Sequence, residues 1–284
     1  MLQLFLLSLL VGCSDDLKKS GPSSGASHAG SISVLTYNVH GLPALITGDD
    51  TPARMMDIAG RLGGFDLVGL QEDWMVDNHG LLLADVDYQT RSWFDETMMG
   101  RVYGSGLSTL ARFSVLDART VHYSTCHGTL DGASDCLASK GFQVHRLSVG
   151  DGSIDFYNTH FEAGGGAQDQ EARAVQVEEV LDFIDSWSVG QAVVFTGDFN
   201  LHSQDAADAA LLEGLQERAE LVDACESVSC AEPTHIDRVW VRSGTDMLLT
   251  VTDWSNLSAD FLDDQGVDLS DHPPLAAMVE WAVP

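Results

Sequence analysis

Apolar runs in this chain end repeatedly at residues whose side chains carry oxygen or nitrogen. Residues 192–196 form one such run, and Asp198 and Asn200 follow it closely. Side chains alternate between the two faces of an extended segment, so we expect Asp198 and Asn200 to point the same way and Phe199 to point to the other face. Two polar groups would then share one cleft. A carboxylate placed there can orient or deprotonate a water molecule.

The same placement recurs at five other points of the chain. Taken singly, each of these residues is typical of a strand cap or a turn. Taken together, they offer the carboxylate and amide oxygens that Mg²⁺ prefers as ligands, and histidines that transfer protons near neutral pH. The residues are Asn38, Glu72, His160, Asp237, Asp271 and His272.

These residues lie at the ends of predicted strands. Short apolar runs bounded by turn residues predict strands at 31–37, 66–70, 106–110, 114–123, 141–148, 153–158, 192–196, 236–241, 247–252 and 274–281. Asp151 and Gly152 predict a hairpin turn between two of them. Apolar residues spaced by three and four predict an amphipathic helix at 169–187, and weaker patterns predict helices at 52–62 and 204–218. Many strands with few covering helices indicate a layered α/β sandwich in one domain, residues 31–284.

Seven motifs occur in an order that points to one family. They read T-Y-N-V-H-G-L, V-G-L-Q-E, G-L-S-T-L-A-R-F, N-T-H-F, T-G-D-F-N, H-I-D-R-V and S-D-H-P-P. Together they resemble the endonuclease/exonuclease/phosphatase superfamily over nearly all of residues 31–284. The resemblance implies a four-layer αββα sandwich of two packed mixed β-sheets flanked by helices. It also implies a metal-dependent phosphodiesterase, with Mg²⁺ as the usual ion and Mn²⁺ or Ca²⁺ as alternatives.

The resemblance further implies a metal-binding and a proton-transfer group. Glu72 would hold the metal with Asn38 nearby, and Asp271 would assist this ion or a second one. His272 would act as a general acid or base. Neighbours in an extended segment face apart, so Asp271 is poorly placed to orient His272, and the family supplies Asp237 for that task.

Three more residues would contact the phosphoester in such a site. His160 would donate a hydrogen bond to the phosphoryl oxygens, Asp198 would orient or deprotonate the attacking water, and Asn200 would hold the phosphate. Other polar residues near the motifs are expected to lie in loops or to make supporting hydrogen bonds. These are His40, His202, His235, Arg173 and Gln176.

Two segments look like the secreted sphingomyelinase branch of this superfamily. Residues 135–142 contain a Lys-Gly pair, and residues 158–164 resemble a T-H-L-Q-A turn. Phe161 and Glu162 replace the Leu and Gln of that turn, which leaves the headgroup open. The resemblance implies a sphingomyelinase or phospholipase C activity on a lipid headgroup.

The charge of the chain bears on its partners. The net charge is −29, and residues 31–284 hold eleven arginines and one lysine, Lys140. Long duplex DNA gains affinity from many Lys and Arg contacts, so we expect no stable nucleic-acid complex. Polyanionic inositol phosphates are disfavoured for the same reason. A DNase-like extracellular nuclease and a non-catalytic surface binding module on this scaffold remain as alternatives. We expect a monomer.

The N-terminus resembles that of a bacterial lipoprotein. Residues 2–11 are apolar but too short to span a bilayer as a helix, which takes about 20 residues. We therefore predict a signal peptide at 1–12, with an apolar first strand as the alternative. L-V-G-C at 10–13 resembles a lipobox with Cys13 as the lipidated residue, although residues 1–3 lack the usual positive charge. Residues 13–30 predict a flexible tether, so we expect an exported, membrane-anchored protein on the periplasmic or cell-surface side.

The four remaining cysteines form two close pairs along the chain. Cys126 with Cys136 and Cys225 with Cys230 predict two local disulfides in an oxidising compartment. A zinc site is the alternative. It is disfavoured because no C-x-x-C spacing occurs.

Overall fold

Two six-stranded sheets form the centre of the molecule. The computed structural model describes residues 28–84, 86–129, 134–231 and 235–284. The first sheet has the order β11-β12-β1-β2-β4-β3, in which only β1 and β2 run parallel. Its strands are β1 (Ala29–Asn38), β2 (Leu67–Gln71), β3 (Thr90–Phe94), β4 (Leu107–Ala111), β11 (Leu248–Asn256) and β12 (Leu275–Ala282).

The second sheet has the order β5-β6-β7-β8-β10-β9, in which only β7 and β8 run parallel. Each sheet is therefore mixed, as predicted. Its strands are β5 (Val115–His122), β6 (Gly141–Val149), β7 (Gly152–His160), β8 (Ala192–Asp198), β9 (Val222–Asp223) and β10 (Asp237–Arg242).

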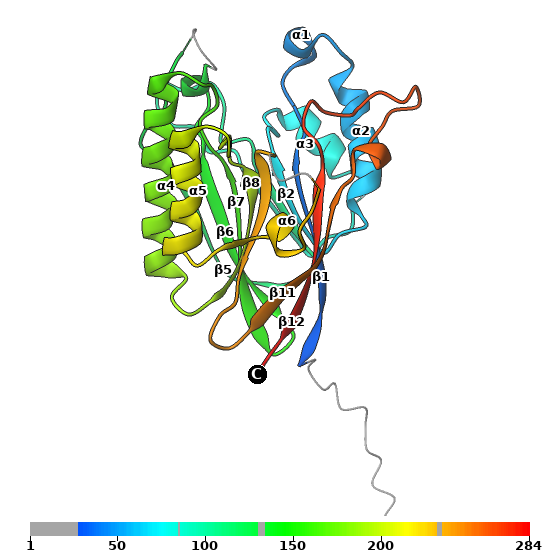
Figure 1. The fold of residues 1–284 in the computed structure, drawn as a ribbon. Helices are drawn as coiled ribbons and strands as arrows, with labels where there is room; N and C mark the ends of the chain where they lie inside the picture. Colours follow the sequence, from blue (N-terminus) through cyan, green and yellow to red (C-terminus); the bar gives the residue numbers. More distant parts are fainter. Residues whose placement is uncertain (1–27, 85, 130–133, 232–234) are drawn as a thin grey trace, which may run out of the picture.

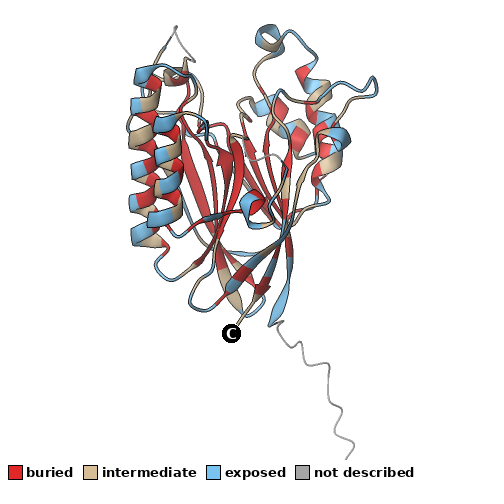
Figure 2. Cartoon of the chain, viewed as in Figure 1, coloured by how far each residue is buried: buried red, intermediate tan, exposed pale blue. Residues whose placement is uncertain are grey.

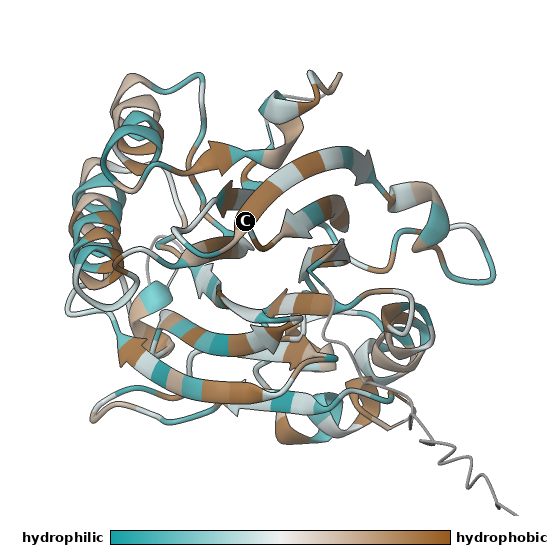
Figure 3. Cartoon of the chain, turned by 90° about the horizontal axis from the view of Figure 1, so that it is seen from below, coloured by the Kyte–Doolittle hydropathy of each residue, from teal (hydrophilic) through white to brown (hydrophobic). Residues whose placement is uncertain are grey.

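Helices cover the outer face of each sheet, which gives four layers (Figure 1). α4 (Ala167–Trp187) and α5 (Ala206–Arg218) cover the second sheet, while α2 (Thr51–Leu62) and α3 (Val76–Leu82) cover the first. Two short helices, α1 (Ala44–Thr47) and α6 (Ala224–Ser227), lie in connections. Seen from below, the strands lie between helices on two sides (Figure 3). The four-layer sandwich is confirmed.

Three buried apolar clusters fill the spaces between the layers. One lies between the sheets and includes Ile32, Val194 and Val279, and one lies under each helical layer. Burial is concentrated along the strands and on the inward faces of the helices (Figure 2). The apolar face predicted for 169–187 is the face of α4 that packs on the second sheet, where Val177, Leu181 and Ile184 are buried.

The structure differs from the sequence predictions in several details. β3, β9 and α3 were not predicted. The hairpin turn lies one residue earlier than expected: Val149 pairs with Gly152, so Gly150 and Asp151 form the turn, and Gly150 has a φ of 56°. Glycine at the first central position is what a type II′ turn requires. β1 begins at Ala29, inside the predicted tether, and the predicted signal peptide and Cys13 lie outside the described residues.

A polar layer joins the two sheets within the buried interior. Gln71 Nε2 of β2 donates to Asn158 Oδ1 of β7 at 2.7 Å, and Asn158 Nδ2 donates to the carbonyl oxygen of Leu70 at 3.0 Å. Thr196 Oγ1 of β8 donates to the carbonyl oxygen of Tyr157 at 3.0 Å. Buried amides are costly unless they are hydrogen-bonded, so this layer fixes the relative position of the sheets.

Both predicted disulfides are present. Cys126 is bonded to Cys136 and Cys225 to Cys230, with Cα–Cα distances of 5.3 and 5.0 Å. Across the described ranges, every helix is too short or too polar to cross a bilayer.

Gly69 offers a test of the close approach of the two sheets. A Cβ at this residue of β2 would lie 2.2 Å from Thr196 Oγ1 and 3.0 Å from Asn158 Oδ1. We expect Gly69→Ala to lower the free energy of unfolding by about 1–3 kcal/mol, because the polar layer must shift to admit the methyl group. Denaturant titration followed by circular dichroism measures this.

Gly60→Ala in α2 is the matched control, because a Cβ there meets no heavy atom within 4 Å among the described residues. It should leave stability unchanged or raise it by up to about 1 kcal/mol through helix propensity. Equal stability of both variants would contradict the proposed tight contact.

Candidate active site

Strand register places three predicted site residues side by side at one end of the second sheet. His160 ends β7 and is paired with Asp198 at the end of parallel strand β8. Asp198 is paired in turn with Asp237, the first residue of antiparallel strand β10. Asn38 ends β1 in the facing sheet, where Glu72 directly follows β2. The strand ends of both sheets thus meet at one site.

Asp198 lies at the centre of this site and is 1% exposed. Its Oδ2 accepts from Asn38 Nδ2 at 3.0 Å and lies 3.4 Å from His160 Nε2 and 3.7 Å from His272 Nε2. Burial, together with the charge of neighbouring Asp237, raises the pKa of Asp198 to about 6. Such a carboxylate can hold a water molecule and receive a proton from it.

His272 is oriented by Asp237 through a short hydrogen bond. The distance from His272 Nδ1 to Asp237 Oδ2 is 2.8 Å, which directs Nε2 of the ring toward Asp198. Burial lowers the pKa of His272, but the hydrogen bond to Asp237 and the nearby carboxylates outweigh it and raise the pKa to about 10. Asp271 points elsewhere, with Oδ1 at 3.3 Å from His40 Nδ1.

The predicted metal ligands lie together around His40. His40 Nδ1 is 3.8 Å from Glu72 Oε2 as well as 3.3 Å from Asp271 Oδ1, so the two carboxylates share one neighbour. Glu72 Oε2 also has a long contact of 3.4 Å from Trp74 Nε1. Both carboxylates keep lone pairs for a hard cation, and their chemistry fits one. The amide nitrogen of Asn38 donates to Glu72 and Asp198, and its oxygen accepts from the backbone N–H of His40.

Within the described ranges, two other groups of side chains lie close enough together to share an ion. One comprises Asp198, Asp237 and His272, in which His272 Nδ1 is already bonded to Asp237. The other comprises Asp223, Cys225 and His235, but Cys225 is in a disulfide and offers no thiolate. The first group suits proton transfer and the second is structural.

Three non-glycine residues of the site have left-handed backbone conformations. The φ angles are 48° for His40, 60° for Glu72 and 48° for Asn200. Such conformations cost of order 1–3 kcal/mol each and persist only where the surroundings enforce them. Strain of this kind concentrates at functional sites.

The backbone at Asn200 corrects one step of the sequence reasoning. β8 ends at Asp198, so the alternation of an extended strand does not reach Asn200. Asn200 instead turns back, with its N–H donating to Asp198 Oδ1 at 3.1 Å and its Nδ2 donating to the carbonyl oxygen of Phe161 at 3.2 Å. Both side chains belong to the site, but through a turn rather than through a shared strand face.

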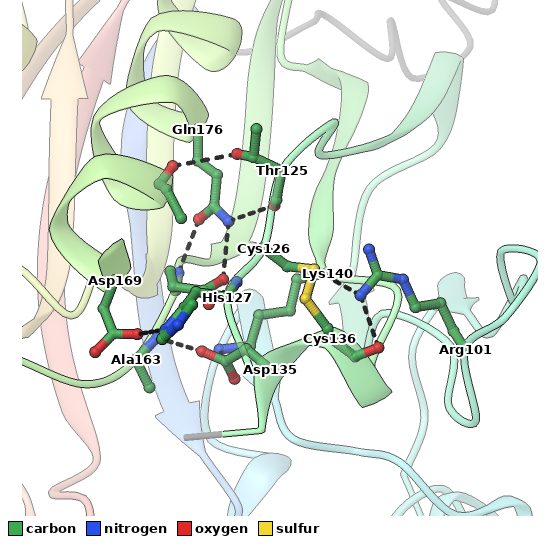
Figure 4. Close-up of a disulfide and its surroundings, with 12 residues drawn as sticks. Arg101, Thr125, Cys126, His127, Asp135, Cys136, Lys140, Ala163, Asp169 and Gln176 are labelled. Carbon is green, nitrogen blue, oxygen red and sulfur yellow. Dashed lines mark hydrogen bonds and ion pairs between the residues drawn. A yellow bond between two sulfur atoms is a disulfide. The ribbon is translucent and has the colours of Figure 1, made fainter. Parts of the chain in front are cut away.

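Lys140 is a site residue to which the sequence reasoning gave no role. Its Nζ is 2.8 Å from Asp135 Oδ1, 2.8 Å from the carbonyl oxygen of Phe161 and 3.1 Å from His160 Nε2. The three donors of the ammonium thus match three acceptors, and Figure 4 shows Lys140 beside Asp135 and the Cys126–Cys136 disulfide. Burial and the charge of Lys140 hold the pKa of His160 well below its usual range, so its imidazole is neutral.

Glu162 occupies the position at which the resembling turn carries Gln. It is buried and accepts from the backbone N–H of His127 at 2.5 Å and from Gln176 Nε2 at 3.2 Å. Burial and repulsion from Asp135 raise the pKa of Glu162 to about 7. Gln176 and Arg173 of α4 make the supporting hydrogen bonds expected of them, since Arg173 donates to the carbonyl oxygens of Glu162 and Gly164.

Comparison with known proteins is consistent with this architecture. Residues 109–224 match the model of Endonuclease/Exonuclease/phosphatase family 2. A protein of Mycobacterium bovis named "Sphingomyelinase" is 28% identical over 265 residues, which covers 87% of this chain and 52% of that protein. The chain therefore spans about half the length of this relative.

Solved structures share the fold over almost their whole length. Sphingomyelinase C from Streptomyces griseocarneus matches with a TM-score of 0.65 and 20% identity, covering 88% of this chain and 99% of that one. A mutant beta toxin from Staphylococcus aureus with bound magnesium ions matches with a TM-score of 0.66 and 14% identity, covering 87% and 99%. These matches show the fold that this chain shares with the solved structures, and the family match covers residues 109–224 of its 284 residues.

Proposed function

We propose that this chain is a metal-dependent phosphoric diester hydrolase that acts on a lipid headgroup. The observation that carries the proposal is the convergence of side chains from both sheets on the buried carboxylate of Asp198. A buried charge is tolerated when it is paired and hydrogen-bonded, and here its partners are groups that bind phosphate or transfer protons.

Glu72 and Asp271 would hold a divalent cation, and Asn38 Nδ2 donates to both Glu72 and Asp198. When bound, such an ion neutralises charge that builds on the phosphoryl oxygens. Mg²⁺ is the proposed ion, because the donors are hard oxygens. Mn²⁺ would bind the same donors.

The chain's own residues divide the remaining tasks. Asp198 orients the attacking water and accepts its proton, while His272 holds a proton at Nε2, the ring nitrogen left free by the bond to Asp237. Nε2 of His160 accepts a hydrogen bond from Lys140 Nζ. His160 Nδ1 is buried without a hydrogen-bond partner among the described residues. A neutral imidazole of this kind donates from Nδ1, which modifies the role predicted for His160. Asn200 Nδ2 would contact the phosphate.

A phospholipid is the proposed substrate rather than a nucleic acid. The Mycobacterium bovis protein named "Sphingomyelinase" aligns with 87% of this chain. The net charge of −29 repels polyanions, whereas a phosphocholine headgroup carries a cation that tolerates nearby carboxylates.

The substrate class and the metal requirement can be measured together. Protein stripped with EDTA is assayed with and without Mg²⁺ against sphingomyelin, a lysophospholipid, single-stranded DNA and duplex DNA. We expect release of the phosphorylated headgroup with Mg²⁺, and loss of this activity after EDTA treatment. Cleavage of DNA alone would favour a nuclease, and inactivity on every substrate would favour a binding module.

A second prediction concerns His272. His272→Ala removes the group that transfers a proton, so kcat on the preferred phosphodiester should fall about 10²- to 10⁴-fold. Steady-state kinetics measures this, with His202→Ala as a control because the His202 side chain is exposed and belongs to no hydrogen bond of the site. Full turnover by His272→Ala would refute its assignment.

We further propose that the protein is exported and anchored through Cys13. The apolar N-terminal run and the lipobox-like L-V-G-C support this, and two disulfides are typical of an oxidising compartment. Cys13→Ser should move the protein from the membrane fraction to the soluble fraction. Unlipidated full-length protein in the cytoplasm, identified by mass spectrometry of the wild type, would contradict the anchor.

A further inference from the structure

Arg54 of α2 connects two loops of the candidate site that are far apart in sequence. Its Nη1 donates to the carbonyl oxygen of Val39 at 3.1 Å and to that of Leu269 at 2.6 Å. Its Nη2 donates to the carbonyl oxygen of His40 at 2.8 Å. Val39 and His40 directly follow Asn38, while Leu269 lies just before Asp271 and His272. One guanidinium therefore contacts both the loop after β1 and the loop before β12.

The backbone carbonyl oxygens at the start of the loop after β1 accept hydrogen bonds from side chains. Ser270 Oγ donates to the carbonyl oxygen of Asn38 at 2.7 Å, so three consecutive carbonyls, at residues 38 to 40, are bonded by Ser270 and Arg54. This loop contains the left-handed His40. A strained loop keeps its conformation only if its surroundings hold it, and Arg54 supplies two of these bonds.

The charge of Arg54 is compensated outside the site. Its Nε donates to Asp49 Oδ2 at 2.6 Å, and Asp49 Oδ1 accepts from the hydroxyls of Thr47 and Thr51. The side chain of Arg54 is 12% exposed. Because Asp49 balances the charge, the remaining N–H groups are free to bind backbone oxygens.

We infer that Arg54 is a positioning residue that sets the distance between the metal-binding side of the site and the His272 side. His40, held by Arg54, contacts both Glu72 and Asp271, and the Leu269 carbonyl held by the same guanidinium fixes the start of the segment that carries His272. The inference rests on the proposed function for its consequence in catalysis. Its structural part does not depend on it.

Lysine cannot replace Arg54 in this arrangement. The four partners lie around a planar fork, with Asp49 on Nε and the carbonyl oxygens on the two terminal nitrogens. An ammonium group is a single point with three donors and cannot reach acceptors on both loops and Asp49 together. Arg54→Lys and Arg54→Met should therefore have similar effects on the site.

Arg61 provides a matched control on the same helix. It donates from Nε to the carbonyl oxygen of Asp260 at 2.8 Å and from Nη2 to that of Leu262 at 2.5 Å. These carbonyls belong to the same connection between β11 and β12, where Leu262 pairs with Asp268, but Arg61 has no hydrogen bond to Leu269, Asp271 or His272 among the described residues. Arg61→Met thus removes a comparable link between helix and loop without contacting the site.

Two measurements on the full chain test the inference. The first is Mn²⁺ binding to the metal-free protein, followed by the electron paramagnetic resonance signal of free Mn²⁺. We expect Arg54→Met and Arg54→Lys to weaken Mn²⁺ about 10- to 100-fold, as supporting residues of metal sites do, and Arg61→Met to leave it unchanged. The second is the downfield proton resonance of the hydrogen bond between His272 and Asp237, assigned by its absence in His272→Ala. It should broaden or disappear in both Arg54 variants and persist in Arg61→Met.

The outcomes separate this inference from the proposed function. If the wild type hydrolyses no phosphoester or binds no Mn²⁺, the proposed function fails, but the proton resonance still tests Arg54. If both Arg54 variants keep the resonance and wild-type Mn²⁺ affinity, Arg54 does not position the site. Equal losses in Arg61→Met would show a general effect of loosening α2, which would also overturn the inference.

Discussion

The burial of the Asp198 carboxylate is the constraint on which the site depends. An ionised carboxylate removed from water is expensive unless several donors surround it. Here the donors come from both sheets, because Asn38 ends β1 and the N–H of Asn200 lies just after β8. The position of one sheet relative to the other along the strand direction must therefore be fixed, so that the strand ends lie next to each other. Inside the sandwich, the hydrogen bonds of Asn158 with Gln71 and with the carbonyl oxygen of Leu70 hold the sheets in that register.

The same constraint explains why the backbone is strained around the site. Strands that continued regularly would carry Glu72 and Asn200 past the level of Asp198. Each instead has a left-handed conformation within two residues of the end of its strand. Neighbouring hydrogen bonds maintain these turns: the carbonyl oxygen of Glu72 accepts from the N–H of Gly41, and Asp198 accepts from the N–H of Asn200. The rigid sandwich thus stabilises conformations that an isolated loop would abandon.

The sequence predicted the positions of the strand ends better than the contacts between them. Polar side chains follow the apolar runs 192–196 and 66–70, and the resemblance of the ordered motifs to one family placed Asp198 and Glu72 in the same predicted site. β3, with the sequence Thr90-Arg91-Ser92-Trp93-Phe94, was missed because its alternation is irregular and no strong turn residues bound it. Lys140 had a position in a family-like segment, but its contacts with Asp135 and His160 depend on how a loop folds over β7.

Arg54 shows a second limit of sequence reasoning. Its partners in the two site loops are backbone carbonyls, which every residue possesses, so no pattern of side chains signals them. The conformation of Asn200 was likewise not predictable from alternation, because alternation assumes an extended strand that continues two residues beyond the end of β8 at Asp198. Side-chain chemistry at strand ends is visible in a sequence, whereas the bonds that hold loops in place require the fold.

The distribution of charge connects the fold to the choice of substrate. Several buried cations are each paired with an aspartate: Lys140 with Asp135, Arg173 with Asp208, and Arg238 with Asp223. Positive charge neutralised in this way contributes little to the long-range field, so the net charge of −29 dominates at a distance and repels polyanions. At short range, a cation bound by Glu72 and Asp271 would reverse the local sign. A headgroup with both charges approaches such a surface without the repulsion that a DNA strand meets, and this is the electrostatic argument for a zwitterionic lipid as the proposed substrate.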